Sequence, residues 1–183
     1  MRNKYTIEEH IHRFASWAAS TGARASKKCR FKVEQGKEII ENSGLYEICK
    51  NINNLPIAKE FDSFHLKIRN NMITEAKKNN LPNFTHGVAA KLINIYMKAI
   101  FINSKQYNVN KIKCIHPPID RILLNELYKS NVDFKKEIWN KYKKIGWSNF
   151  DNHDYQNLID NIKHVTPKND GLWTIEKYWQ GFQ

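Results

Sequence analysis

The stretch that decides the fold is residues 85–103, which read THGVAAKLINIYMKAIFIN. Its apolar residues recur at helical spacing, and Thr85 has the short oxygen-bearing side chain that caps a helix N-terminus. The sequence therefore predicts a strongly apolar helix over His86–Asn103. Asn79–Asn83 reads as the turn that precedes it, and Ser104–Ile115 reads as a basic loop that follows it.

Nearly every other segment also shows helical spacing, and none shows sustained strand alternation. The sequence predicts an all-α fold, a compact domain of about eight or nine helices spanning residues 1–183. Two helical sub-lobes of that domain can flank a cleft. The remaining predicted helices cover 6–22, 28–42, 45–52, 61–78, 119–129, 133–144, 151–164 and 172–179.

The first of these helices carries a clear start signal and an apolar stripe. Thr6 and Glu9 have the spacing of a capping box. The stripe follows at helical spacing and consists of Ile7, Ile11, Phe14, Trp17 and Ala18. We expect most of the large aromatic side chains to lie in the core, with one or two free to stack on a base: Phe14, Trp17, Trp139, Trp147, Trp173 and Trp179.

The composition points to a globular protein with an anionic partner. Hydrophobic residues make up 41% of the 183 residues and aromatic residues 12%, which favours a packed core over disorder. Thirty Lys and Arg residues against 18 Asp and Glu residues give a net charge of +12. Such a surplus favours nucleic acid or an acidic membrane face, although a lysine-rich genome would also produce it.

Several classes of protein are not favoured. No apolar run approaches the roughly 18 residues of a membrane-spanning helix, and Met1–Tyr5 does not begin an apolar secretory segment. The cysteines, Cys29, Cys49 and Cys114, are widely spaced and read as reduced thiols. We therefore expect a cytoplasmic, nucleoid-associated monomer without metal or cofactor.

Two neighbouring motifs carry recognisable chemistry. The first is Gly87-Val88-x-x-Lys91-x-x-Asn94-Ile95, and the second is Pro118-Ile119-Asp120-Arg121. Together they resemble the helix-hairpin-helix superfamily of DNA glycosylases, the repair enzymes related to endonuclease III and 8-oxoguanine glycosylase. Twenty-nine positions separate Lys91 from Asp120, a spacing similar to that of the archaeal 8-oxoguanine glycosylase branch.

The resemblance implies a role for each motif residue. Lys91 would be the nucleophile, Asp120 the catalytic carboxylate, and Gly87 and Val88 part of a hairpin that grips a DNA phosphate. Two departures stand out: Ala89 occupies the place of a second hairpin glycine, and the Leu-Pro pair lies too far upstream. Neighbouring basic residues would contact DNA, namely His86, His116, Lys105, Lys111 and Lys113.

The chemistry of these residues can also be judged without the family. Burial beside Val88 and Leu92 would lower the pKa of Lys91 and free its amine to attack. Alternatively, Lys91 extends to solvent from a half-buried helix. Asp120 falls in the first helical turn, where a carboxylate can simply cap the helix. Neither alternative explains why the two groups would share one cleft.

The sequence therefore predicts a DNA glycosylase with β-lyase activity that acts on a modified or oxidised base in double-stranded DNA. Two other functions stay open. One is a non-catalytic basic DNA- or RNA-binding protein. The other is a nuclease-type defence effector, for which the sequence shows no metal-binding carboxylate cluster.

Overall fold

The computed structural model describes residues 5–24, 28–104 and 109–181. These residues form helices and connecting segments without a β-strand, which confirms the predicted all-α fold. The α-helices are α1 (Ile7–Ala23), α2 (Val33–Asn42), α3 (Leu45–Cys49), α4 (Phe61–Lys78), α5 (His86–Met97), α6 (Asn110–Lys113), α7 (Arg121–Lys129), α8 (Lys136–Ile145) and α9 (Asn152–Val165). No helix in the described ranges is long and apolar enough to cross a membrane.

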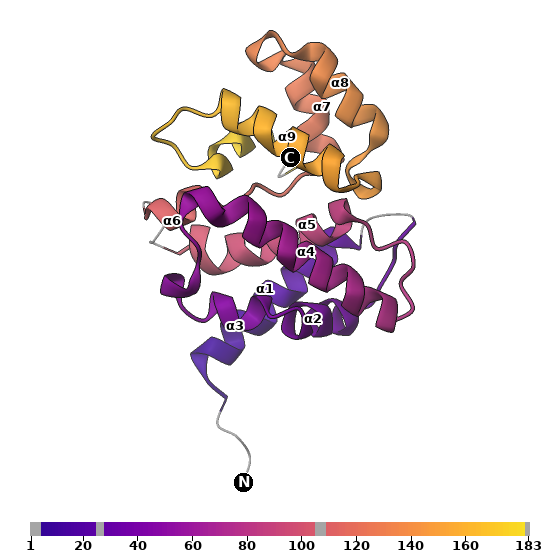
Figure 1. Cartoon of the computed structure of the whole chain (residues 1–183), viewed down its shortest axis with the longest axis vertical. Coiled ribbons are helices and arrows are strands. Elements are labelled where there is room, and N and C mark those ends of the chain that lie inside the picture. Colours follow the sequence, from indigo (N-terminus) through magenta and orange to yellow (C-terminus); the bar gives the residue numbers. More distant parts are fainter. Residues whose placement is uncertain (1–4, 25–27, 105–108, 182–183) are drawn as a thin grey trace.

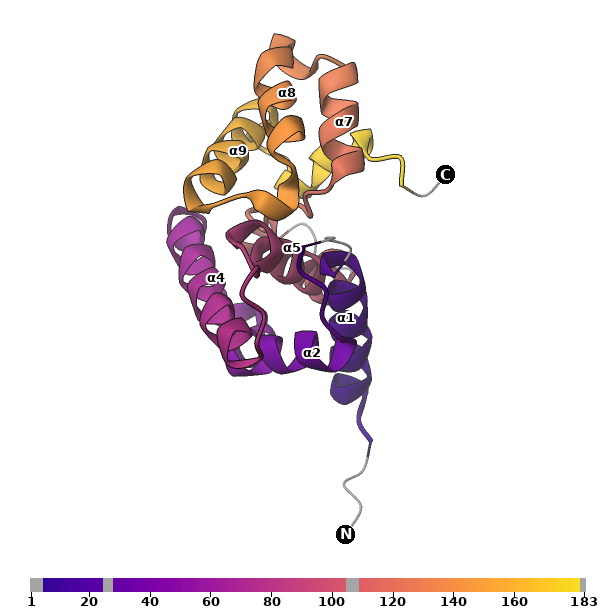
Figure 2. The same ribbon diagram turned by 90° about the vertical axis from the view of Figure 1, so that its right-hand side faces the viewer.

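The helices gather into two groups (Figures 1 and 2). The helices α1 to α5 form one group, and α7, α8 and α9 form the other. The second group also contains a 3-10 helix, η6 (Leu172–Tyr178). The helix α5 lies between α1 and α4 and also contacts α9. Nearly all of its side chains are buried, as its apolar sequence predicts.

The start of α5 depends on Thr85 and on a close approach by a second short helix. Thr85 accepts a hydrogen bond from the Val88 backbone at 3.2 Å, as expected of an N-cap residue. Gly87 packs directly against the backbone of the 3-10 helix η5 (Trp147–Asn149). A Cβ at Gly87 would lie 1.8 Å from the Trp147 carbonyl oxygen, so only glycine permits this contact.

The buried face of α1 differs from the one that the apolar stripe suggested. Phe14 and Trp17, expected in the core, are more than half exposed. The buried side consists of small residues and one histidine: His12, Ala15, Ser16, Ala19, Ser20 and Ala23. Small side chains let helices approach closely, and α1 packs along α5 through this side. Close packing therefore decided the orientation of the helix, and hydrophobicity alone did not.

Several helix boundaries also differ from the predicted ones. The predicted helix 133–144 begins only at Lys136, because Asp133 and Phe134 adopt left-handed backbone angles with φ of 54° and 55°. The end of the predicted helix 86–103 is a π-helical turn, η3 (Lys98–Ile102). The predicted helix 172–179 is the 3-10 helix η6. Trp139 and Trp147 lie in the core, as expected.

Candidate active site

Lys91 and Asp120 meet at the junction of the two helix groups. Lys91 lies one helical turn beyond Gly87 on α5, and its side chain is only 8% exposed. Asp120 is the N-cap residue of α7. The distance from Lys91 Nζ to Asp120 Oδ2 is 3.9 Å. Two residues that are far apart in the sequence thus form a long ion pair.

The Asp120 carboxylate is held from two sides. Its Oδ1 accepts a hydrogen bond from the Leu123 backbone at 2.8 Å, which is the capping interaction. Its Oδ2 accepts a hydrogen bond from the Trp179 indole at 2.9 Å. Capping and a role toward Lys91 are therefore compatible, because each uses a different carboxylate oxygen.

The Lys91 amine lies against an aromatic face. Its Nζ is 4.2 Å from the centre of the Trp147 ring, a cation–π arrangement. Burial lowers the pKa of Lys91, and the nearby charge of Asp120 acts in the opposite direction. Because burial prevails, a larger fraction of this amine is neutral at a given pH than for an exposed lysine.

A pocket of about 340 Å³ opens beside this pair. It brings together α1, α5, η3, the segment before α7, and η6. It also contains a second ion pair, between Lys98 and Glu176. Burial raises the pKa of Glu176, although Lys98 partly offsets the effect. The lining residues are Phe14, Ala18, Gly22, Lys91, Ile95, Lys98, Ala99, Asn103, Pro118, Asp120, Glu176 and Trp179.

A buried amide links the two motifs. Asn94 follows Lys91 by three positions on α5 and is fully buried. Its Nδ2 donates to the Pro117 carbonyl at 2.8 Å and to the Tyr155 hydroxyl at 3.0 Å. Its Oδ1 lies 2.9 Å from His65 Nε2. Asn94 thereby fixes the segment that leads into Asp120 to the helix that carries Lys91.

The hairpin residues do not present open amides. The Gly87 N–H donates to the Phe150 carbonyl at 3.1 Å, and the Val88 N–H donates to Thr85. Both residues are buried. The two backbone N–H groups that the resemblance assigns to phosphate binding thus already donate hydrogen bonds within the protein. The glycine instead gives η5 the space to place Trp147 over Lys91.

The two histidines lie apart from the Lys91–Asp120 pair. His116 is fully buried, with Nδ1 3.1 Å from the Tyr155 hydroxyl and Nε2 3.1 Å from Asp62 Oδ1. Both ring nitrogens thus have partners inside the protein, and the contact of His116 with DNA stays a prediction. His86 is half-buried, and its Nδ1 lies 3.5 Å from Arg69 Nη1.

Two lysines of the segment predicted as a basic loop, Lys111 and Lys113, lie on the short helix α6 and bond to backbone carbonyls of the protein. Lys111 Nζ donates to the Asn53 carbonyl and Lys113 Nζ donates to the Asn169 carbonyl, both at 2.9 Å. A neutral carbonyl leaves the lysine charge uncompensated, so both can still attract phosphate. Lys105 lies outside the described residues.

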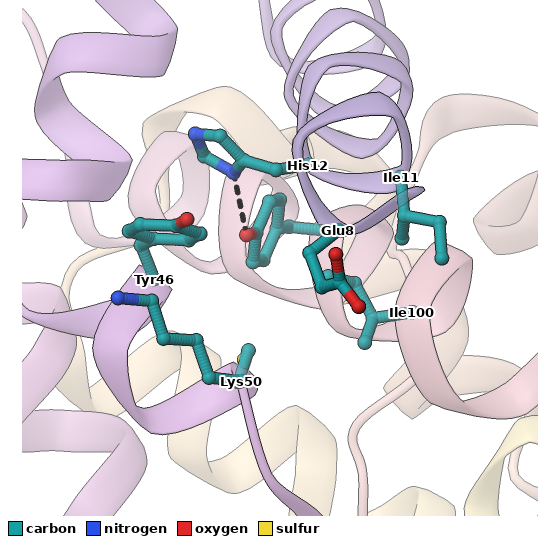
Figure 3. A pocket seen from close by; sticks show the side chains of 8 residues that line it. Glu8, Ile11, His12, Tyr46, Lys50 and Ile100 are labelled. Atoms are coloured by element: carbon teal, nitrogen blue, oxygen red, sulfur yellow. Dashed lines mark hydrogen bonds between the residues drawn. The ribbon is translucent and has the colours of Figure 1, made fainter. Parts of the chain in front are cut away.

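A second pocket, of about 300 Å³, lies farther along α1 (Figure 3). His12 is its central polar residue. Its Nε2 lies 3.1 Å from Glu41 Oε1, and its Nδ1 lies 2.8 Å from the Tyr96 hydroxyl. The His12 ring also packs on Tyr46, with ring centres 4.1 Å apart. Both ring nitrogens are therefore bonded, and aliphatic side chains from α1 and η3 complete the wall, namely Ile11 and Ile100.

The sequence motifs predicted Lys91 and Asp120 but missed the groups around them. Trp147, Trp179, Lys98 and Glu176 come from segments without a motif, and no sequence signal connects them to the pair. Comparisons with protein-family models, with curated proteins and with solved structures found no match for this chain.

Proposed function

We propose that this protein is a DNA glycosylase with β-lyase activity that removes a modified or oxidised base from double-stranded DNA. The observation that carries the proposal is the meeting of Lys91 and Asp120 in one pocket, 3.9 Å apart. A buried amine beside an oriented carboxylate is the pair that this chemistry needs.

Lys91 would act as the nucleophile at C1′ of an extruded nucleotide. Its attack breaks the glycosidic bond, and the bonding electron pair leaves with the base, which takes up a proton. The new amine then loses a proton, the sugar ring opens with a proton on O4′, and a Schiff base results. Loss of a proton from C2′ then expels the 3′ phosphate. The lowered pKa of Lys91 favours the first step, because only the neutral amine can attack.

Asp120 would stabilise the positive charge that develops on the sugar as the base departs. Its two hydrogen bonds, from Leu123 and Trp179, fix the carboxylate before substrate arrives. A charged group held in place in this way costs no reorganisation during the reaction. Its second oxygen also faces the Lys91 amine, so the attacking group and the stabilising group lie on one side of the pocket.

Pocket size and net charge also support the proposal. A volume of about 340 Å³ lies in the range of small-molecule sites, and an extruded base must enter a site of this kind. The net charge of +12 favours binding to the phosphates of DNA.

The test is borohydride trapping on a duplex that contains one abasic site. This substrate isolates the attack of the amine and does not require knowledge of the lesion. We expect a covalent adduct that peptide mapping locates at Lys91, and Lys91→Ala should lose it. The matched control is Lys98→Ala, which removes another lysine from the same pocket and should retain the adduct.

A second assay tests base removal with duplexes that carry oxidised, alkylated or deaminated bases, in the presence of EDTA. Cleavage of one of them would support the glycosylase. Cleavage that depends on Mg²⁺ would favour a nuclease. Salt-dependent binding without any cleavage or adduct would favour a non-catalytic nucleic-acid-binding protein.

A further inference from the structure

The helix α1 presents large apolar side chains to solvent. Ile7, Ile11, Phe14 and Trp17 are 64%, 43%, 57% and 53% exposed. A contiguous exposed apolar face on a folded protein commonly marks a binding surface. The sequence pattern alone suggested that this face would be buried, so its exposure is a result of the tertiary structure.

Two aromatic rings on this face adjoin the Lys91 pocket. The rings of Phe14 and Trp17 lie 5.8 Å apart between centres and are tilted by 39°. Phe14 also lines the pocket that contains Lys91 and Asp120. The exposed aromatic pair therefore lies beside the candidate active site, with Phe14 at its rim and Trp17 one turn further along α1.

Positive charge lies beyond the aromatic pair. Arg24 is the C-cap residue of α1, and it lines a surface hollow of about 450 Å³ together with Thr21, Arg30 and Phe31. Both arginines are exposed, and neither forms an ion pair with a carboxylate among the described residues. The aromatic pair on α1 thus has the lysine-containing pocket beside it and two arginines near the C-terminal end of the helix.

This arrangement matches the chemistry of an unpaired nucleic-acid strand. Bases stack on exposed aromatic rings, and neighbouring cations hold the phosphates. Flanking arginines favour the polyanion, in agreement with the net charge of +12.

We propose that Phe14 and Trp17 form a stacking platform for unpaired bases of a DNA strand, with Arg24 and Arg30 holding the adjoining phosphates. The platform deepens the proposed function, on which it rests, because it would hold the strand whose nucleotide enters the Lys91 pocket. Such a platform contacts the faces of the bases and therefore tolerates any base sequence.

The test compares two single strands of equal length by fluorescence anisotropy. One is oligothymidine, and the other consists of abasic sugar-phosphate units. Phe14→Ala or Trp17→Ala should each weaken binding of oligothymidine about tenfold, since one base–aromatic stack contributes on the order of 1–3 kcal/mol. Binding of the abasic strand should stay unchanged, because it has no base to stack. Trp17→Phe should retain most of the affinity.

Two further variants complete the design. Ile7→Ala is the matched control, because Ile7 is as exposed as the aromatic pair but lines neither pocket along α1. It should change neither affinity. Arg24→Ala should weaken both strands alike and reduce the slope of log K against log salt by about 0.7 for each phosphate that the variant no longer neutralises.

The proposal is overturned if the aromatic variants bind oligothymidine as well as the wild type does, or if they weaken both strands equally. It is also overturned if sedimentation shows a dimer that Phe14→Ala dissociates, since the face would then join two copies of the chain. If the wild type forms the adduct at Lys91 but Phe14→Ala and Trp17→Ala do not weaken binding of oligothymidine, the glycosylase proposal is supported and the platform is rejected. A loss of affinity for oligothymidine alone, without any covalent adduct at Lys91, would support the platform and contradict the proposed glycosylase activity.

Discussion

Two pockets lie one after the other along α1 and differ in how their polar groups are bonded. In the pocket of Figure 3, both ring nitrogens of His12 have partners, Glu41 and Tyr96. In the other pocket, no hydrogen bond joins the Lys91 amine to any described residue, and its nearest carboxylate oxygen is 3.9 Å away. One pocket thus holds a histidine whose ring nitrogens are both hydrogen-bonded, and the other holds an amine whose neighbours are a carboxylate at ion-pair distance and an aromatic ring.

The difference separates a structural cluster from the cluster that we propose to be reactive. A buried polar group with all its hydrogen bonds stabilises the fold, whereas removing a charge from water costs free energy that a long ion pair only partly offsets. The pKa of Lys91 is lowered because burial disfavours its charged form. Strained electrostatics of this kind are typical of functional sites, because the same feature that costs stability makes the amine nucleophilic.

The largest expected effect is that of Asp120→Asn on the proposed reaction. The amide keeps the shape and the capping acceptor but loses the charge that stabilises the cationic sugar and the acceptor for the Trp179 indole. We expect the rate of base removal to fall by about 10²–10³, and the free energy of unfolding by about 1–2 kcal/mol. Single-turnover kinetics and urea denaturation measure the two quantities.

Asp151→Asn is the control for this experiment. Asp151 caps α9 as Asp120 caps α7, accepting a hydrogen bond from the Asp154 backbone at 2.8 Å. The same substitution there should leave the rate unchanged. An equal loss of rate in both variants would mean that helix capping, and not charge in the pocket, explains the effect.

The next largest effect concerns the link between the two helix groups. Asn94→Ala would remove the hydrogen bonds to Pro117, Tyr155 and His65, leaving buried groups without partners. We expect the free energy of unfolding to fall by about 3 kcal/mol and adduct formation at Lys91 to slow, because Asp120 loses its anchor. Asn70→Ala, on the exposed side of α4, should change stability by less than about 0.5 kcal/mol. Unchanged adduct formation in a destabilised Asn94→Ala would show that Asn94 does not position the site.

A smaller effect is expected in the His12 pocket. Tyr96→Phe removes the hydroxyl that bonds His12 Nδ1 and should lower the free energy of unfolding by about 1–2 kcal/mol. The rate of adduct formation should stay at the wild-type value. Tyr46→Phe keeps the ring that packs on His12 and serves as the control. A large rate loss in Tyr96→Phe would assign the second pocket a part in the reaction.

The smallest effect is a shift in titration. Burial lowers the pKa of Lys91, and Asp120 opposes this, so Asp120→Asn should lower that pKa further. Adduct formation would then reach its maximum at a lower pH, because the neutral amine forms earlier as the pH rises. Nuclear magnetic resonance of ¹³C-methylated lysines measures the pKa directly. Lys50, whose pKa is raised by a hydrogen bond to Glu47, should not respond. A rise in the pKa of Lys91 would contradict the ion pair.

The helix positions were largely predictable because they depend on local signals. Phe61–Lys78 was predicted with the bounds that α4 has, and Thr85 and Asp151 cap the helices that they precede. The exposed stripe of α1 was not predictable from spacing. It arises because the side of α1 with small residues, among them Ala15, Ala19 and Ala23, is buried in a fold in which α1 contacts both α5 and α2. A sequence pattern does not show which neighbour a helix will meet.

Some residues of the candidate site could be seen in the sequence, and others could be found only in the structure. The types and order of Lys91 and Asp120 were visible in the motifs, and the proposed pairing of the two residues followed from the resemblance. Trp147, Trp179 and Glu176 carry no local signal, because their roles depend on where η5 and η6 pack. The burial of His116 and its hydrogen bond with Asp62 were likewise not visible in the sequence, although the residue lies beside a motif.

By itself, the sequence determined the all-α class, most helix positions and the positive charge. These follow from periodicity, capping and composition, which are properties of short segments. Only the tertiary structure decided that Lys91 lies buried between Asp120 and Trp147, that Gly87 serves packing, and that Phe14 and Trp17 face solvent. The physical reason is that burial and pKa depend on which helices pack together, and packing joins residues that no local pattern connects.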